Sequence, residues 1–466
     1  MPIDLKSLTI FDAASLLRSK KISSVELVEA SLKRIEALNP KLNAYVTVAA
    51  EKALESAKQA QSEIDRGQYR GPLHGIPMSV KDIFYTQGIR TASGEKKLEK
   101  FVPTYDATMV AKLKAAGAII VGKTTPVYGE FMPEPYFGYA KNPWDSTKLP
   151  GYSSSGSAVA VSTSMDLGSV GSDGGGSVRY PAACCGLVGM KPTFGRVSRY
   201  GSAVYGIPND YVGPLTRTAF DNAIVLEAIA GYDPRDPFSA DLPVPKFSRS
   251  LSGNIRGMRI GVPKEHFWDL LDSEVESASR KALTVFEEMG CEVEEVSIPA
   301  MPEVDTYHSM LSHAETSAYY QPQLKNWPKD YPETLMLRVE WGAKVPAIDY
   351  IKGAEARSRI RQQIDSALEK VDALFSAASV LPPPPLGHFK FTLKGVDLDI
   401  GALASRLQRP YNTTGHPAVV APCGFTKGGL PLSFQLGGRN FDEAALLKLV
   451  DGYQRATDWH TKRPKI

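Results

Sequence analysis

Long hydrophobic runs are absent from this 466-residue sequence, which argues against a helix that crosses a membrane. Cysteine is scarce, and no CxxC pair occurs, so the usual zinc-knuckle and redox motifs are excluded. A strong charge of one sign is also lacking, because 54 basic and 51 acidic residues leave a net charge of +3. This balance gives no electrostatic reason to expect binding to nucleic acid or to an anionic membrane.

The N-terminus lacks the basic segment and apolar core of a secretory signal and opens instead into a helix pattern. We therefore expect a cytoplasmic protein whose cysteines stay reduced. Apolar residues make up 43% and charged residues 23%, which is the balance of a globular protein. A homodimer is compatible with this composition, which leaves the oligomeric state undecided.

Helical and strand patterns alternate along the chain, without a repeat, a linker or a low-complexity tract. Residues 5–60 are expected to be helical, with a capping box at Ser23–Glu26 and a stop at Asn39-Pro40. Strands are expected at 76–80, 118–121, 258–262, 293–298, 373–381, 418–422 and 430–436, and helices at 108–116, 154–164, 219–230, 274–289, 347–370 and from 443.

This alternation predicts one large α/β/α domain over residues 1–466, with a mixed central sheet covered by helices on both faces. The catalytic core is expected over about 70–215. Residues 300–345 are rich in aromatics, and we expect them to be irregular, as a lid or pocket-forming insertion.

One motif points to nucleotide binding but has the wrong context. Residues 117–124, Gly-Ala-Ile-Ile-Val-Gly-Lys-Thr, match the phosphate-loop pattern GxxxxGK[ST]. Such a loop follows a strand and opens a helix, whereas here a helix precedes Gly117 and the intervening residues form a strand. Gly117 is better explained as the residue that ends the helix. We therefore expect no nucleotide cofactor.

The most informative stretch is Gly171-Ser-Asp-Gly-Gly-Gly-Ser177. The glycines at 174, 175 and 176 leave backbone N–H groups unobstructed, and the hydroxyl of Ser177 follows directly. Two interpretations are open. The stretch is either a flexible surface loop, which is the commoner case, or a nucleophile beside its own anion hole.

A serine nucleophile needs a base, and none of the seven histidines lies in a hydrolase signature. A lysine can serve if burial lowers its pKa, and Lys81 ends an apolar strand. The alternative is that Lys81 pairs with Asp82 at the strand end. A second cluster, Gly151-Tyr-Ser-Ser-Ser-Gly-Ser157, is either a helix N-cap or a hydroxyl relay between Lys81 and Ser177.

Together these motifs resemble the amidase signature family along nearly the whole chain. The matching segments are Pro72–Asp82, Asp106–Thr108, Gly117–Lys123, Asn142–Asp145, Pro150–Ser157, Gly171–Pro181, Gly189–Thr193 and Gly415–Ala418. The resemblance implies a triad without metal or cofactor: Ser177 as nucleophile, Ser153 as bridging serine beside a cis peptide, and Lys81 as base and acid. It also implies an oxyanion hole from the N–H groups of Gly174, Gly175, Gly176 and Ser177, supported by Ser154 and Asp173.

The sequence departs from the family pattern near the expected substrate pocket. Tyr152 and Ser155 stand where glycines are usual, a variant similar to allophanate- and malonamide-hydrolysing branches, and the segment after Lys123 also differs. We expect a roomier aromatic pocket lined by Tyr128, Phe131, Met132, Tyr152 and Ser155.

The resemblance implies hydrolysis of a C–N amide bond through a serine acyl-enzyme. We expect a stand-alone amidohydrolase for a small amide or carbamate, with anilide or ester activity by the same chemistry and no nucleic-acid or membrane partner. The stretch Arg409–Ala418 looks closer to free amidases than to the A-type glutaminase chain of the amidotransferases. The alternative is that glutaminase chain, part of a tRNA-dependent amidotransferase, which the run Lys191–Gly201 resembles. A catalytically silent scaffold is opposed by the intact triad.

Overall fold

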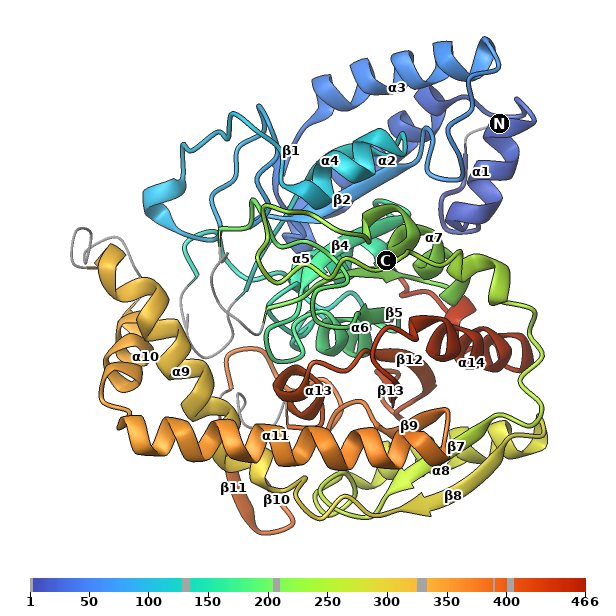
Figure 1. The fold of residues 1–466 in the computed structure, drawn as a ribbon. Helices are drawn as coiled ribbons and strands as arrows, with labels where there is room; N and C mark the ends of the chain where they lie inside the picture. Colours follow the sequence, from blue (N-terminus) through green and yellow to red (C-terminus); the bar gives the residue numbers. More distant parts are fainter. Residues whose placement is uncertain (1–2, 128–134, 204–209, 325–332, 389, 400–405) are drawn as a thin grey trace.

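The computed structural model describes residues 3–466 except 128–134, 204–209, 325–332, 389 and 400–405. The described residues form an eleven-stranded sheet in the order β1-β3-β2-β4-β6-β5-β12-β13-β9-β7-β8 (Figure 1). Its strands are β1 (Tyr45–Val48), β2 (Pro77–Lys81), β3 (Ile119–Thr124), β4 (Gly168–Ser172), β5 (Val188–Lys191), β6 (Val212–Thr216), β7 (Arg259–Pro263), β8 (Glu292–Val296), β9 (Ala373–Ala377), β12 (Ala418–Phe425) and β13 (Pro431–Gly437). A separate ribbon pairs β10 (Lys390–Leu393) with β11 (Val396–Asp399).

The sheet mixes parallel and antiparallel pairs. Strand β2 runs parallel to both β3 and β4, and β7 runs parallel to β8 and β9. The middle of the sheet is antiparallel, because β12 pairs with β5 on one side and with β13 on the other. The predicted mixed sheet within one large α/β domain is therefore confirmed.

Helices cover both faces of the sheet, as predicted. Strand β3 shows why: Ile120 belongs to one buried cluster, whereas Ile119 and Val121 belong to the other. The first cluster takes side chains from α1 (Ile10–Arg18), α4 (Thr108–Ala115), α7 (Ala219–Ile229), α8 (Ser273–Glu288) and α14 (Glu443–Ala456). The second takes them chiefly from α2 (Ser24–Leu42), α3 (Ala50–Asp65), α5 (Ser155–Ser162) and α6 (Arg179–Cys185).

Two local predictions for the N-terminal segment need correction. The capping box at Ser23 and Glu26 is present, but α2 runs through Pro40 to Leu42. Proline sits here in the last turn, and the helix ends where Asn43 takes a left-handed conformation with φ +50°. The segment is also not wholly helical, because β1 lies between α2 and α3 and pairs with β3.

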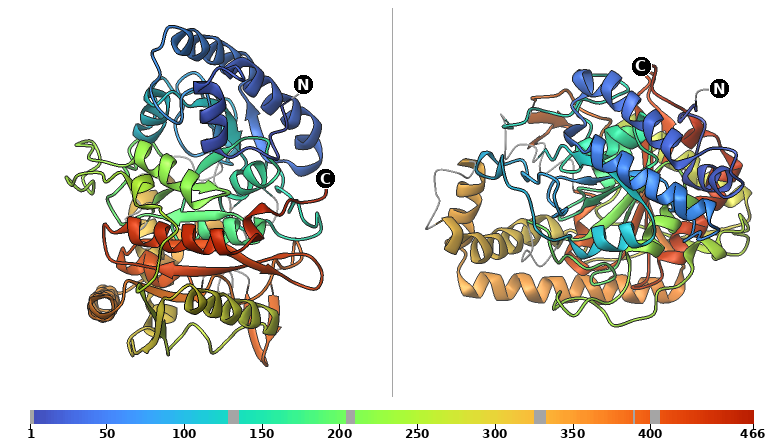
Figure 2. Two further views of the ribbon diagram at one scale, coloured as in Figure 1. Left: turned by 90° about the vertical axis from the view of Figure 1, so that its right-hand side faces the viewer. Right: turned by 90° about the horizontal axis from the view of Figure 1, so that it is seen from above.

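The predicted irregular insertion over 300–345 is helical in its described part, so that prediction is wrong. It forms α9 (Glu303–Leu324) and α10 (Glu333–Ala343), which lie beside the long helix α11 (Ala347–Lys370) at the edge of the molecule (Figure 2). The inner face of α9 is formed by Val304, His308, Leu311 and Glu315, which are buried at helical spacing. Two of these four side chains are polar, so the hydrophobic period that identifies a helix does not show in the sequence.

The remaining helical elements are short. They are α13 (Arg409–Thr414) and the 3-10 turns η1 (Lys96–Leu98), η3 (Phe247–Ser250) and η5 (Trp459–Thr461). In the described part of the chain, no helix is long and apolar enough to cross a membrane. All four cysteines are free and buried.

Candidate active site

Lys81 lies at the carboxyl end of β2 and is fully buried. The neighbouring parallel strand β4 ends at Ser172, so the two strand ends meet at one edge of the sheet. Lys81 Nζ lies 2.7 Å from Ser153 Oγ and 3.0 Å from Ser172 Oγ. The lysine therefore faces hydroxyl groups inside the protein, as a proton-transfer role requires.

The pKa of Lys81 is lowered to about 8, because burial disfavours the charged ammonium. The carboxylates of Asp210 and Asp173 act in the opposite direction and limit the drop. Asp82, the partner considered from the sequence, accepts the N–H of Ala92 at 3.0 Å and lies 3.8 Å from Lys123 Nζ. A pKa of about 8 leaves a useful fraction of neutral amine near neutral pH, which a general base needs.

Ser153 and its neighbours connect the second serine cluster to the glycine stretch. The peptide bond Tyr152–Ser153 is cis, as the family resemblance implies. The N–H of Ser154 donates to the carbonyl of Ser177 at 3.1 Å, and its hydroxyl donates to the carbonyl of Ser172 at 3.2 Å. Ser154 therefore binds the backbone on both sides of the glycine stretch and holds the two serine segments together.

The glycine loop, residues 173–177, presents backbone donors next to Ser177. The N–H of Gly176 donates to the Asp173 carboxylate at 2.7 Å and is engaged within the loop. Within the described ranges, the N–H groups of Gly174, Gly175 and Ser177 have no protein acceptor. Gly176 has φ +112°, and a Cβ there would collide with the side-chain oxygen of Gln408. The loop thus requires glycine at 176 and leaves three other amides available to a ligand oxygen.

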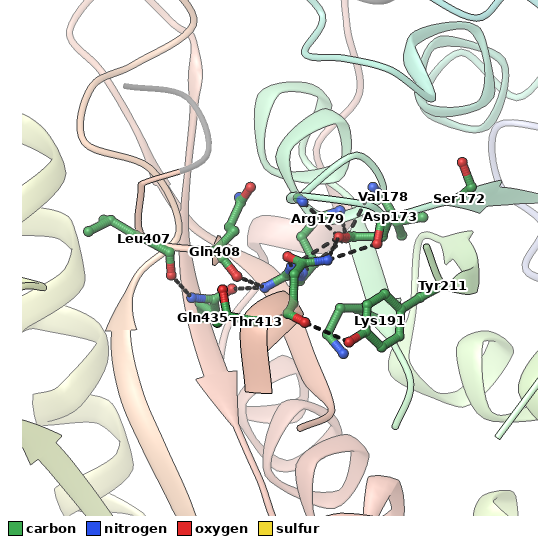
Figure 3. A network of polar contacts seen from close by, with 12 residues as sticks. Ser172, Asp173, Val178, Arg179, Lys191, Tyr211, Leu407, Gln408, Thr413 and Gln435 are labelled. Carbon is green, nitrogen blue, oxygen red and sulfur yellow. Dashed lines mark hydrogen bonds and ion pairs between the residues drawn. The ribbon is translucent and has the colours of Figure 1, made fainter. Parts of the chain in front are cut away.

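A buried ion pair fixes the start of this loop (Figure 3). Asp173 and Arg179 are both fully buried, and the guanidinium contacts both carboxylate oxygens at 3.0 Å. Arg179 Nη1 also donates to Gln435 Oε1 at 2.8 Å, and Asn412 Nδ2 donates to Asp173 at 2.9 Å. Burial alone would raise the pKa of Asp173, but Arg179 and the other donors hold it well below its usual range. Asp173 is therefore ionised at neutral pH, and its carboxylate anchors the loop to β13 and α13.

Three residues beside the glycine loop were missed by the sequence interpretation: Asp210, His308 and Gln408. A Cβ at Gly174 would lie 3.5 Å from Asp210 Oδ1, and one at Gly175 would lie 3.6 Å from His308 Nε2. Burial raises the pKa of Asp210 to about 6, against the opposing effect of Lys81 and Arg199. No local motif identifies these residues, because each reaches the loop from a separate segment of the chain.

The expected substrate-binding residues can be placed only in part. Tyr128, Phe131 and Met132 lie outside the described residues. Tyr152 is half-buried, with its ring centroid 5.4 Å from that of Tyr180 in an edge-to-face contact. Ser155 is fully buried, and its hydroxyl donates to the carbonyl of Gly151 at 2.6 Å. The Ser155 hydroxyl is therefore engaged by its own loop.

The arrangement combines an amine of lowered pKa, two serine hydroxyl groups within hydrogen-bond distance of it and backbone donors without a protein acceptor among the described residues. In the ranges that the structure describes, no group of three His, Cys, Asp or Glu side chains could hold a metal ion. A serine activated through Ser153 and Lys81 could attack a carbonyl whose oxygen sits on the loop amides. The chemistry that this geometry supports is acyl transfer.

Comparison with known proteins agrees with this chemistry. The family model "Amidase" matches residues 26–447. The A chain of the glutamyl-tRNA(Gln) amidotransferase of Roseiflexus sp. (strain RS-1) is 39% identical, and the alignment covers 99% of both chains. A solved chain from a vestigial protein complex linked to the origins of an s-triazine catabolic enzyme has a TM-score of 0.91 at 27% identity, over 98% of this chain and 100% of that chain. The solved A chain of the Thermotoga maritima glutamyl-tRNA(Gln) amidotransferase has a TM-score of 0.80 at 29% identity, over 96% and 94% of the two chains.

These relatives contradict three expectations drawn from the sequence. The relatives at 37–39% identity are subunits of an amidotransferase, so the main expectation, a stand-alone small-molecule amidohydrolase, is wrong. The expectation of a small amide or carbamate substrate without nucleic acid falls for the same reason, as does the closeness to free amidases. The predicted closeness to free amidases rested on Arg409–Ala418 alone, and the similarity over the whole chain outweighs this short stretch. The net charge of +3 gave no reason to expect a nucleic-acid partner. A net charge is a sum over the whole chain, so it says nothing about a tRNA that binds to another subunit of a complex.

Proposed function

Because the chain belongs to the amidase family, we propose that it is the glutamine-hydrolysing subunit of a glutamyl-tRNA(Gln) amidotransferase. One observation carries this proposal: the 39% identity to the A chain of such an enzyme extends over 99% of both chains. The run Lys191–Gly201, which resembles the same branch, supports it from within the sequence.

In the first half of the reaction, Ser177 attacks the side-chain amide carbon of glutamine. Its proton passes to Ser153, and Ser153 passes its own proton to Lys81, which lies 2.7 Å away. The carbonyl oxygen becomes an oxyanion, which the N–H groups of Gly174, Gly175 and Ser177 stabilise by hydrogen bonds. Lys81 then returns a proton through Ser153 to the leaving nitrogen, and ammonia departs from a glutamyl ester on Ser177.

In the second half of the reaction, a water molecule takes the position beside the Ser177 ester that the ammonia has left. Lys81 takes a proton from water through Ser153, the hydroxide attacks the ester carbonyl, and glutamate is released as Ser177 regains its proton. Each half moves one proton to Lys81 and one proton back. The lysine therefore must be neutral at the start of each half, which its lowered pKa allows.

The proposal includes partner subunits and a tRNA-bound substrate. On another subunit of the complex, the side-chain carboxylate of Glu-tRNA(Gln) would first be activated by ATP as an acyl phosphate, and the ammonia released at Ser177 would then displace phosphate to form the amide. This chain would then supply the nitrogen, and its partners would supply the acceptor.

The test is glutamine-dependent formation of Gln-tRNA(Gln) from Glu-tRNA(Gln). The full-length chain is combined with the other subunits of the amidotransferase from the same genome in the presence of ATP and Mg²⁺, with Ser177→Ala as the matched inactive control. The wild type should release ammonia from glutamine and form Gln-tRNA(Gln). Ser177→Ala should not hydrolyse glutamine, and it should form Gln-tRNA(Gln) only when ammonium chloride supplies the nitrogen. A wild-type chain that assembles with those subunits yet shows no glutamine-dependent product would overturn the proposal.

A further inference from the structure

His308 of α9 places an imidazole against the glycine loop. A Cβ at Gly175 would lie 3.6 Å from His308 Nε2, an ordinary van der Waals distance. The residue is 7% exposed, so the loop and its neighbours surround it almost completely. Helix α9 lies far from the loop in the sequence, and the fold brings its His308 next to Gly175. The insertion therefore contributes a polar ring directly beside the amides that are available to a ligand.

Thr413 of α13 fixes the orientation of this ring. His308 Nδ1 lies 2.8 Å from Thr413 Oγ1, and both side chains are buried. The preceding residue, Asn412, bonds to Asp173 at 2.9 Å, so α13 binds both the imidazole and the loop. Among the described residues, Nδ1 is the only ring nitrogen of His308 with a hydrogen-bond partner. Nε2 is the nitrogen turned toward the glycine loop.

The environment keeps the ring neutral. Burial lowers the pKa of His308 well below its usual value, and the guanidinium groups of Arg409, Arg338 and Arg357 lower it further. A neutral imidazole has one donor and one acceptor nitrogen, and the partner of one nitrogen sets the role of the other. In this positive field a ligand oxygen is favoured over an ammonium group. The matching arrangement has the Thr413 hydroxyl donating to Nδ1 and the Nε2 proton directed outward.

We propose that His308 is a substrate-binding residue, whose Nε2–H donates to an oxygen of the acyl part of the substrate beside the amides of Gly174 and Gly175. The inference rests on the proposed acyl-transfer site at Ser177. Thr413 is the corresponding positioning residue, because its hydroxyl bonds to Nδ1 and holds the ring in this orientation. The contact would fix the substrate relative to the oxyanion-binding amides and would discriminate against acyl groups without an acceptor oxygen.

The test separates substrate binding from the reactivity of Ser177. Steady-state kinetics with glutamine are measured for the full-length wild type, His308→Ala, His308→Gln and Thr413→Val in the assembled complex. His308→Ala should lower kcat/KM by about 10- to 100-fold, mainly through KM, as expected for one lost hydrogen bond to a polar ligand. His308→Gln restores a donor of similar reach and should recover part of this loss. The kcat/KM of Thr413→Val should lie between the values of the wild type and His308→Ala.

Two controls decide the interpretation. Inactivation by phenylmethylsulfonyl fluoride, which reports the reactivity of Ser177 without the acyl group of the substrate, should stay within about threefold of wild type in all variants. His313→Ala changes another histidine on α9, whose ring lies edge-to-face against Trp341 at 5.8 Å, and should keep wild-type kcat/KM. An unchanged kcat/KM in His308→Ala would overturn the inference. A parallel loss of sulfonyl fluoride reactivity would also overturn it, because His308 would then only support the loop.

Failure of the proposed amidotransferase function can be distinguished from failure of the His308 inference. If the wild type does not hydrolyse glutamine, the proposed function fails, and the same variants are compared on asparagine or acetamide, whichever the wild type hydrolyses faster. With asparagine, which carries further oxygens, the His308→Ala loss should persist. With acetamide, which offers no oxygen beyond the reacting carbonyl, the His308→Ala loss should vanish. The opposite result for either substrate would contradict the inference.

Discussion

Lys81 Nζ and Ser153 Oγ lie 2.7 Å apart, although 72 residues separate them in the chain. The lysine arrives on a strand end and the serine on the turn before α5, next to a cis peptide bond. Ser154, the following residue, binds the carbonyl of Ser177. The proposed proton path from Ser177 to Lys81 therefore draws on two sequence-distant loops and one strand, and its parts can be tested separately.

The pH dependence of turnover should report Lys81. Because the pKa of Lys81 is lowered to about 8 and the base must be neutral, kcat/KM should rise with pH and level off above about 8. Activity is lost as the pH falls, since the ammonium form cannot accept a proton. Lys81→Met should remove this limb and reduce the rate on the order of 10³-fold or more. A rate that stays flat from pH 6 to 9 would contradict the assignment of Lys81 as base.

Asp210 should tune this pKa. Its carboxylate favours the ammonium form of Lys81, so Asp210→Asn should lower the pKa of Lys81 and move the rising limb of kcat/KM to lower pH. The effect should be strongest above pH 6, where Asp210 is ionised. Asp397→Asn is the control, because that carboxylate lies on the exposed β10–β11 ribbon and bonds to Thr392. A limb that does not move, or moves to higher pH, would refute the electrostatic role of Asp210.

Ser153 should matter to turnover far more than another buried serine of the same region. Ser153→Ala interrupts the relay and should lower kcat/KM by about 10²- to 10⁴-fold. Ser162→Ala removes a hydroxyl at the far end of α5 that donates to the carbonyl of Cys185, and it should leave kcat/KM near wild type. Ammonia release assayed side by side gives the comparison. Equal rates for the two variants would rule out a relay through Ser153.

The ion pair of Asp173 and Arg179 should be required for stability. Asp173→Asn leaves the buried guanidinium without its anion, which should lower the free energy of unfolding by about 3–5 kcal/mol. Urea unfolding at pH 7 measures the loss. Asp458→Asn breaks an exposed pair with Lys462 and should leave the urea midpoint unchanged.

Lowering the pH should also remove part of the stability that the pair of Asp173 and Arg179 provides. The pKa of Asp173 is depressed in the folded protein, so the pair contributes its full stability above the ordinary carboxyl pKa of about 4. The contribution disappears as the pH falls below that value toward the folded pKa. The difference in unfolding free energy between wild type and Asp173→Asn should therefore shrink below about pH 4. A difference that is independent of pH would show that the carboxylate charge is not what stabilises the loop.

The sequence predicted the class of fold because its regular segments are locally consistent. The apolar run before Lys81 and the helix at 108–116 appear as β2 and α4 with shifts of only one residue at their ends. The false phosphate loop was recognised by the same logic, since Gly117 has φ +88° and β3 follows it. Prediction from the hydrophobic pattern fails where polar side chains are buried. His308 and Glu315 lie on the buried face of α9, so this face does not show as an apolar stripe in the sequence.

The sequence by itself determined the motifs that favour acyl transfer at Ser177, namely the glycine loop, the serine cluster and Lys81, because short motifs are carried by residue types alone. Only the tertiary structure decided what surrounds them. Asp210 acts on Lys81, Asn412 binds Asp173 and His308 faces Gly175 because strand ends, α13 and α9 converge on one loop. Such contacts depend on how distant elements pack, and packing is a property of the whole core that no local pattern encodes.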